Sequence, residues 1–207
     1  MTAQVVVVGG GPVGLASAIF ARLQGLSVHL VEAGRVDGDK ACGEGLMPGA
    51  WELLEELGVE PSGHELAGVS YRQESLRVDH SFPGRPGRGV RRLELVSALR
   101  ERCAELGVVR RRGRVLSVVQ DPRGVTLVLA DESRLQADYV LACDGLHSGI
   151  ARSLGVRRRQ SRVGRRYGLR QHFGIAPWSS LIEVYYAGDT EVYITPVAED
   201  TVGVAVL

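Results

Sequence analysis

The feature that most constrains this 207-residue chain is a run of four valines that ends in a glycine-rich turn. Val5 to Val8 are apolar without alternation, as in a parallel strand that helices cover on both faces. The turn that follows reads GGGPVG and matches the G-x-G-x-x-G pattern of dinucleotide-binding folds, in which the glycines allow a tight turn, a close approach to pyrophosphate and close helix packing. The candidate cofactor-binding residues of this turn are Gly9, Gly11, Pro12, Val13 and Gly14.

A second apolar strand, Val28 to Val31, ends on an acid, Glu32. A carboxylate at this place is suited to accept hydrogen bonds from both hydroxyls of an adenosine ribose. Ala33, which follows at the tip of the strand, is included among the cofactor-binding candidates. The helix between the two strands would direct its free N–H groups and its dipole at the phosphates. Strand, turn, helix, strand and acid in this order predict a dinucleotide site.

The composition favours a soluble globular protein of one large or two small domains, since 44% of the residues are hydrophobic and the net charge is +1. No apolar run reaches the roughly 20 residues of a membrane span, and no basic segment leads to a cleavage site. We therefore expect a cytoplasmic protein without a transmembrane segment.

Two further classes of site are disfavoured. Cys42, Cys103 and Cys143 lie far apart without a C-x-x-C pair, which argues against a disulfide framework and against a zinc site. Arginines cluster at residues 110–114 and 157–166, but the chain has no strong basic excess and no aromatic residues interleaved with them. These clusters are interpreted as solvated surface, and we expect neither a metal nor a nucleic acid as partner.

A third apolar strand, Tyr139 to Ala142, leads into the segment CDGLHSGIAR at residues 143–152. This segment resembles the second fingerprint, A-D-G-x-x-S-x-x-R, of the flavoprotein monooxygenase superfamily that includes p-hydroxybenzoate hydroxylase and the geranylgeranyl reductases. Cys143 replaces the alanine, and the arginine stands one place later. The resemblance implies FAD as cofactor, with Asp144, Gly145 and Ser148 among the residues that bind it. An Asp-Gly turn with a helix N-cap at Ser148 is expected in either case.

The middle of the chain agrees with this superfamily. The segment at residues 89–109 has the apolar spacing of an amphipathic helix, with an inner face of Leu95, Leu99, Cys103 and Leu106. The resemblance implies that Arg92, in an R-x-x-[LF] pattern, reaches the ribityl and phosphate region of the flavin. Residues 115–119 and 125–129 then alternate around an Asp-Pro-Arg-Gly turn, and a second turn at residues 131–133 completes a three-stranded meander. In the superfamily such a meander replaces a crossover helix.

A further segment, DKACGEGLMP, is similar to the K-x-C-G-x-G-L-x-P pattern of the geranylgeranyl-reductase-like branch. The resemblance implies that this loop borders the isoalloxazine, so Cys42 and Gly43 join the cofactor-binding candidates. The Cys42 thiol is also the one candidate for a catalytic role. The alternative is that Gly43 and Gly45 shape the entry to a helix over residues 50–57 and that Cys42 is a small buried filler.

Alternating strands at residues 69–71, 76–78, 181–187, 191–197 and 201–207 predict an antiparallel sheet, where such relatives bind substrate. The expected fold is α/β: a Rossmann-like FAD-binding parallel sheet with a β-meander crossover, plus part of an antiparallel substrate-domain sheet. We expect a discontinuous FAD-binding domain at residues 1–60 and 89–158. Residues 61–88 and 159–207 would form the partial substrate domain.

The resemblance implies an FAD-dependent oxidoreductase that uses NAD(P)H to hydroxylate a small organic molecule or to reduce an alkene. The third fingerprint of the superfamily does not occur in these residues, so we expect a truncated form that lacks the C-terminal half of the family fold and binds FAD less tightly. A homodimer through an exposed sheet edge is expected as well. The alternatives are a catalytically silent fragment or binding module, and a dehydrogenase that uses a nicotinamide cofactor alone.

Overall fold

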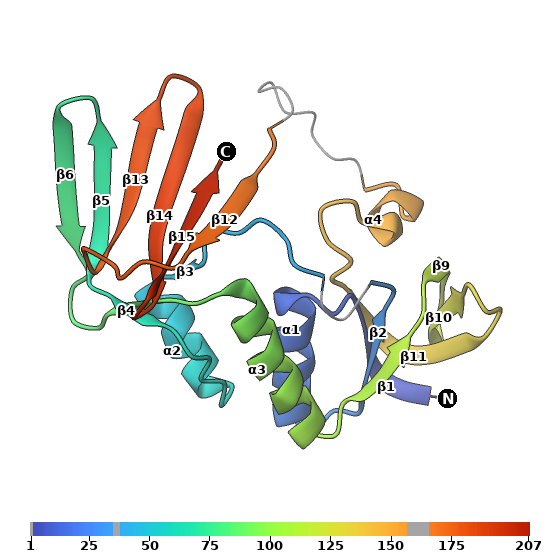
Figure 1. The fold of residues 1–207 in the computed structure, drawn as a ribbon. Helices are drawn as coiled ribbons and strands as arrows, with labels where there is room; N and C mark the ends of the chain where they lie inside the picture. Colours follow the sequence, from blue (N-terminus) through green and yellow to red (C-terminus); the bar gives the residue numbers. More distant parts are fainter. Residues whose placement is uncertain (1, 35–37, 157–165) are drawn as a thin grey trace. The chain divides into compact units, whose positions relative to one another are not determined.

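The computed structural model describes residues 2–34, 38–156 and 166–207, and the chain divides into two compact units (Figure 1). The first unit comprises Met1–Gly38 and Val96–Ser161, and the second comprises Asp39–Leu95 and Arg162–Leu207. The sequence-based boundaries differ from this division, because residues 39–60 and 89–95 group with the second unit and not with the dinucleotide-binding one. Each unit is built around its own six-stranded sheet.

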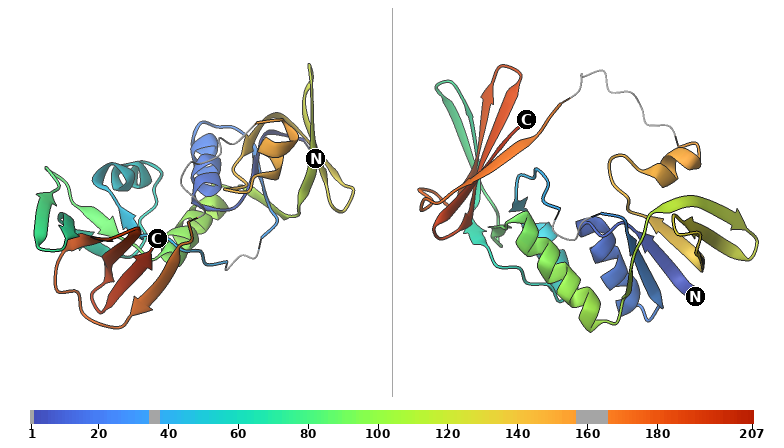
Figure 2. Two further views of the ribbon diagram at one scale, coloured as in Figure 1. Left: turned by 90° about the horizontal axis from the view of Figure 1, so that it is seen from above. Right: turned by 45° about the vertical axis from the view of Figure 1, so that its right-hand side comes forward.

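The sheet of the first unit has the order β8-β2-β1-β11-β10-β9. Its first four strands are parallel to one another, and the last three form the expected antiparallel meander, which Figure 2 shows in yellow-green to gold. The bounds are β1 Thr2–Val8, β2 Val28–Glu32, β8 Val109–Arg112, β9 Val115–Asp121, β10 Gly124–Leu129 and β11 Arg134–Ala142. The predicted α/β fold with a meander crossover is therefore confirmed, while β8 is a strand that the sequence pattern did not predict.

The first unit also contains the helices α1 (Pro12–Leu23), α3 (Arg92–Glu105) and α4 (Gly149–Ser153). The first four residues of α3 are the exception, because they group with the second unit. Leu15 and Ile19 of α1 are fully buried, as the helical spacing requires. The inner face of α3 differs in part from the prediction. Val96, Leu99 and Cys103 are buried, whereas Leu95 and Leu106 are only half-buried.

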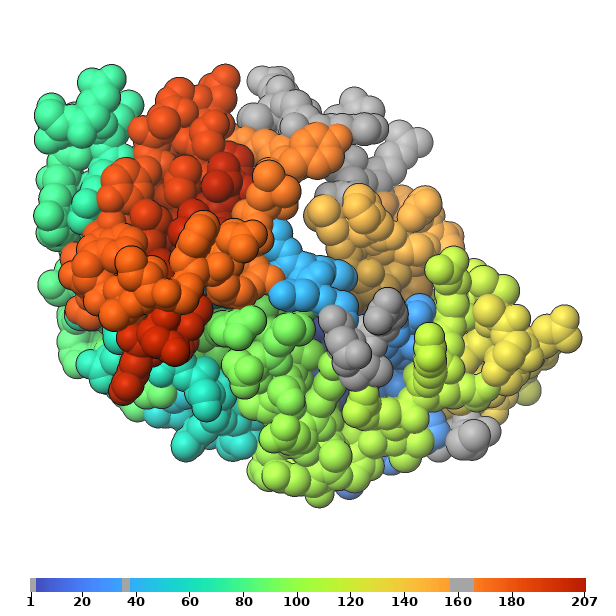
Figure 3. Space-filling view, viewed as in Figure 1, coloured from blue at the N-terminus to red at the C-terminus, as the bar shows by residue number. Residues whose placement is uncertain are grey.

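The sheet of the second unit has the order β12-β15-β14-β13-β5-β6. Its neighbours are antiparallel with one exception, because β13 and β5 run parallel. This pair corrects the expectation of a wholly antiparallel sheet. Figure 3 shows the β5–β6 hairpin, in green, at the surface along one edge. The bounds are β5 Gly68–Gln73, β6 Leu76–Ser81, β12 Leu169–Phe173, β13 Leu181–Ala187, β14 Thr190–Ala198 and β15 Thr201–Val206.

A small three-stranded sheet and helix α2 (Pro48–Glu56) complete the second unit. The strands β3 (Gly45–Leu46), β7 (Gly87–Gly89) and β4 (His64–Leu66) are too short to leave a pattern in the sequence. Close packing explains Gly89, because a Cβ there would lie 1.7 Å from the carbonyl oxygen of Pro196. None of the helices in the described ranges combines the length and the apolar character that a membrane crossing requires.

Candidate functional site

Packing within the first unit accounts for two glycines of the turn after β1. Gly9 has φ +113°, and a Cβ there would lie 2.2 Å from the carbonyl oxygen of Cys143. A Cβ on Gly14 would lie 1.8 Å from the carbonyl oxygen of Gly9. Both distances are far below van der Waals contact, so no other residue fits at either position. Gly9 and Gly14 thus hold α1 close to the strands.

Gly11 is different, because a Cβ there would have no protein atom within 4 Å. Its backbone is extended, with φ −79° and ψ 176°, which any residue adopts. Gly11 is also the N-cap of α1, where no side chain caps the helix, and Pro12 stands at the first helical position. The N–H groups of the first turn therefore face outward, and the side chain of Val13 is 69% exposed. This open, amide-lined helix end fits an anion such as a diphosphate.

Glu32, at the end of β2, is turned toward this turn. Its Oε2 accepts a hydrogen bond from the backbone N–H of Gly10 at 2.5 Å, and its Oε1 accepts one from that of Gly34 at 2.7 Å. The sequence predicted that these oxygens would accept hydrogen bonds from ribose hydroxyls. It did not predict the hydrogen bonds from the two backbone amides. An ionised carboxylate offers about four acceptor positions, so Glu32 keeps capacity for two more donors. Ala33 follows it and is exposed.

The second fingerprint meets the first at the same edge of the sheet. Val8 and Ala142 are partners in the parallel pair of β1 and β11, and the N–H of Cys143 donates to the carbonyl oxygen of Val8 at 2.8 Å. Because the carboxyl ends of parallel strands share one edge, the two turns that follow lie side by side. This is where ligands bind in open α/β sheets.

The Asp144 carboxylate is engaged locally by α4. It accepts hydrogen bonds from the Ser148 hydroxyl and from the backbone N–H groups of Gly149 (2.7 Å) and Ile150 (3.2 Å). Burial alone would raise the pKa of Asp144, but these hydrogen bonds outweigh it and lower that pKa. Ser148 is the N-cap of α4, as predicted, and accepts from the N–H of Ala151 at 2.9 Å.

With three donors on its two oxygens, the carboxylate of Asp144 has little acceptor capacity left for a ligand. The backbone of Gly145 is more available, because the residue is exposed and a Cβ there would meet no atom within 4 Å. Its φ of +86° also explains why glycine stands at this position.

The remaining sequence-predicted candidates, Cys42, Gly43 and Arg92, belong to the second unit. Cys42 is exposed, which contradicts the alternative that it is a buried filler. Gly43 has no side chain, and its backbone carbonyl oxygen accepts a hydrogen bond from the Thr195 hydroxyl at 2.8 Å. Gly45 is required by packing, since a Cβ there would lie 2.6 Å from the side chain of Ile182.

Sequence reasoning missed a buried charged network around Glu44. This residue is 5% exposed and has φ +58°, a conformation that non-glycine residues rarely adopt. Its carboxylate accepts from the backbone N–H of Arg92 at 2.9 Å and from Arg170 Nη1 at 3.1 Å, and it lies 2.7 Å from His172 Nε2. The network fixes the Cys42–Gly45 loop to β12 and to the first residue of α3.

Arg170 links this network to Asp39. Burial alone would raise the pKa of Asp39, but the hydrogen bond and the charge of Arg170 outweigh it and lower that pKa. The Arg170 side chain is only 8% exposed, and its Nε is buried without a hydrogen-bond partner among the described residues.

A second buried carboxylate, Glu183, lies on β13 of the same unit. It pairs with Arg72 Nη2 at 2.6 Å and accepts hydrogen bonds from the Tyr185 hydroxyl at 2.7 Å and from Trp178 Nε1 at 3.2 Å. Burial first, and then the neighbouring Glu183, raise the pKa of Tyr185. Glu183 and Glu44 are thus matched in burial and in number of donors. Across the part of the chain that the structure describes, no cluster of three acidic, histidine or cysteine side chains could hold a metal ion.

Comparison with known proteins supports a flavin site. A family model described as FAD binding domain matches residues 2–199. Menaquinone reductase of Mycobacterium tuberculosis is 33% identical over 167 residues, which cover 75% of this chain and 41% of that protein. Rifampicin monooxygenase of Streptomyces venezuelae is 34% identical over 164 residues, which cover 73% of this chain and 34% of that protein. The chain spans less than half the length of these relatives.

Solved structures agree on the fold. PqsL of Pseudomonas aeruginosa, crystallised with 2-aminobenzoylacetate, superposes with a TM-score of 0.84 at 19% identity, over 100% of this chain and 60% of that one. A geranylgeranyl bacteriochlorophyll reductase-like protein from Thermoplasma acidophilum superposes with a TM-score of 0.77 at 22% identity, over 99% of this chain and 56% of that one. The matches confirm the predicted resemblance to the flavoprotein monooxygenase and geranylgeranyl reductase superfamily.

Proposed function

We propose, from the premise that this chain belongs to the family of FAD binding domains, that its glycine turn holds the diphosphate of FAD. The observation that carries the proposal is the open space beside Gly11. At Gly9 and Gly14, which precede and follow it in the turn, backbone atoms occupy the space that a Cβ would need. Packing explains Gly9 and Gly14, whereas a Cβ at residue 11 would meet no atom of the described residues. Glycine is only one of several residues favoured at an N-cap, so the N-cap position alone does not require it. A ligand that touches the backbone there would require it.

The other contacts follow from the geometry of the turn. The N–H groups of Val13 and Gly14, at the uncapped start of α1, would donate to the phosphate oxygens. Glu32 would use its two remaining acceptor positions for the ribose hydroxyls. Gly145 would offer its backbone to the cofactor, whereas Asp144 would act by fixing the turn through α4. Cys42, Gly43 and Arg92 are proposed to contact the flavin half.

The intact protein is proposed to be an FAD-dependent oxidoreductase with NAD(P)H as the electron donor and a small organic molecule as substrate. When bound, FAD supplies the redox chemistry, and the protein supplies binding, orientation and electrostatics. The names of the relatives include both a reductase and a monooxygenase, so the proposal covers alkene reduction and hydroxylation.

Titration of the purified chain with FAD tests the proposal. We expect quenching of flavin fluorescence with a stoichiometry of about one, and competition by ADP, because the adenosine diphosphate half lies on the first unit. Addition of NADH or NADPH to the loaded chain without oxygen should bleach the flavin band if the chain is active by itself. Binding without bleaching would identify a silent FAD-binding module, and tight NADH binding without FAD binding would favour a nicotinamide-only dehydrogenase.

Homodimer formation through a sheet edge is a further proposal. Among the described strands β8 has one neighbour, β2, so its outer edge offers unpaired backbone groups. Light scattering that gives the mass of a monomer at all concentrations would contradict it.

A further inference from the structure

The order of the strands in the first unit maps the expected path of an adenosine diphosphate. The glycine turn follows β1, Glu32 ends β2, and β8 is the next strand beyond β2. A ligand with its diphosphate at the turn and its ribose at Glu32 therefore carries its base toward the carboxyl end of β8. The residues that end β8 are arginines that sequence analysis assigned to solvated surface.

Arg112 is the arginine placed beside the ribose position. It is the register partner of Glu32 in the parallel pair of β2 and β8, and in-register partners point to the same face of a sheet. The next rung of the ladder is also intact, because the N–H of Gly113 donates to the carbonyl oxygen of Glu32 at 2.9 Å. Arg112 is thus held one strand away from Glu32 by regular backbone pairing.

The side chain of Arg112 is exposed and makes no hydrogen bond or ion pair with any residue in the described ranges. Glu32 does not engage it, since the carboxylate is turned to the amides of Gly10 and Gly34. A planar cation with five donors therefore stands unpaired beside the predicted ribose site.

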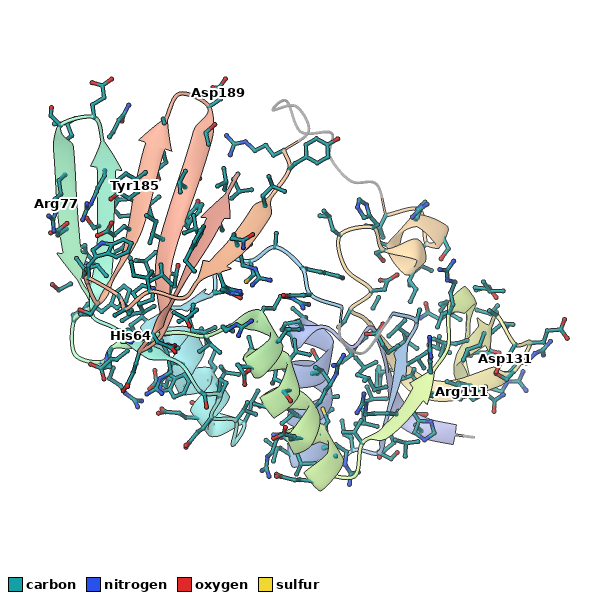
Figure 4. All side chains as sticks on the ribbon, viewed as in Figure 1. His64, Arg77, Arg111, Asp131, Tyr185 and Asp189 are labelled. Atoms are coloured by element: carbon teal, nitrogen blue, oxygen red, sulfur yellow. The ribbon has the colours of Figure 1, made fainter. Side chains whose placement is uncertain are left out.

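The neighbouring arginines are placed differently. Arg111 points to the opposite face, where it pairs with Asp131 Oδ2 at 2.8 Å (Figure 4). Arg114 lies beyond the ladder with β2, and its carbonyl oxygen accepts from the N–H of Ala130 at the end of β10. Arg110 shares the face of Arg112, but it lies two residues farther from the carboxyl edge, opposite Leu30.

We propose that Arg112 binds the adenine base, with its guanidinium stacked on the ring. Arginine stacks on aromatic faces through both its plane and its charge, and adenine is the flat group that follows the ribose. A phosphate on the ribose is the less suitable partner, because it would come close to the carboxylate of Glu32. The inference rests on the proposed function, since it needs an adenosine diphosphate on this turn.

The test compares Arg112→Ala, Arg112→Lys and the matched control Arg110→Ala, with FAD, 5′-ADP and 2′,5′-ADP as ligands. We expect both variants at position 112 to weaken FAD and 5′-ADP about tenfold, because lysine keeps the charge and loses the plane. Arg110→Ala should bind both ligands like the wild type. Circular dichroism spectra should be the same for all the variants, because both side chains are exposed.

Three results would overturn the inference. Wild-type affinity in Arg112→Ala would exclude any contact between Arg112 and the ligand. Wild-type affinity in Arg112→Lys would mean that a positive charge is sufficient and that no planar group stacks on the base. Loss of 2′,5′-ADP binding with unchanged 5′-ADP binding would assign Arg112 to a 2′-phosphate. Failure of the wild-type chain to bind FAD and ADP would instead contradict the proposed function itself.

Discussion

Replacing Gly11 and Gly14 by alanine, one at a time, should separate ligand binding from packing. For Gly11→Ala, the backbone already has an extended conformation that alanine adopts, and the new Cβ meets no atom within 4 Å. The unfolded chain loses conformational freedom, which stabilises by about 0.4–1 kcal/mol, and the helix loses a glycine N-cap, which costs a similar amount. We therefore expect the free energy of unfolding to change by less than about 0.5 kcal/mol.

Gly14→Ala should behave in the opposite way. The new Cβ would lie 1.8 Å from the carbonyl oxygen of Gly9, so α1 must move away from the turn by more than 1 Å to reach ordinary contact. Overpacking against side chains costs about 1–3 kcal/mol, and a backbone oxygen yields less readily. Alanine gains at most about 1 kcal/mol over glycine in a helix, which offsets part of that cost. With the steric cost at the upper end of its range, the expected net loss is on the order of 2 kcal/mol.

The assays are urea denaturation followed by circular dichroism, and FAD titration followed by flavin fluorescence. The methyl group of Gly11→Ala stands where the diphosphate is expected, and a steric cost of about 1–3 kcal/mol corresponds to an affinity weaker by roughly fivefold to 150-fold. Gly174→Ala is the matched control, because its Cβ also meets no atom within 4 Å. Unchanged FAD affinity in a stable Gly11→Ala variant would refute the reasoning, since the open face would then have no ligand.

Three further predictions concern stability and reactivity. Glu44→Gln should lower the free energy of unfolding by about 3 kcal/mol, because it removes the buried one of the two carboxylates that pair with the Arg170 guanidinium. Glu183→Gln should cost less, because its arginine partner is 25% exposed, and equal urea midpoints for wild type and Glu44→Gln would contradict this. The lowered pKa of Asp144 means that its contribution is complete at neutral pH and is lost as pH falls below about 4, so the stability difference between wild type and Asp144→Asn should shrink between pH 6 and pH 3. A thiol reagent should modify Cys42 in the native protein and Cys103 only in urea, because Cys42 is exposed whereas burial raises the pKa of Cys103 to about 11.

Local patterns predicted most of the first unit. The strand, turn, helix and strand over residues 5–32 are continuous in sequence, and so is the meander over residues 115–142. Strand β8 was not predicted, because its four residues include three arginines and because its only described neighbour, β2, is distant along the chain. The parallel pairing of β5 with β13 was not predicted either. Periodicity indicates that a segment forms a strand, but it does not indicate which strand is its neighbour.

The site was predictable where backbone geometry demands a particular residue. Gly9, Gly14 and Ser148 fulfil local requirements of a turn, a helix contact and a cap, and such requirements leave a pattern. The donors around Glu44 leave none, because they come from residues 92, 170 and 172. Long-range pairing of charged groups depends on the folded chain, so no spacing in the sequence marks it.

Acceptor capacity decides which acid of this chain is suited to a ligand. Asp144 and Glu44 each have three donors around two oxygens, and those donors fix α4 in one case and a loop in the other. Glu32 has two donors, both of them backbone amides of flanking turns, and it is half-exposed at the carboxyl edge of the sheet. The two amides orient the carboxylate without filling it, so Glu32 is the acid of the three that can accept ribose hydroxyls without giving up a contact that holds the fold.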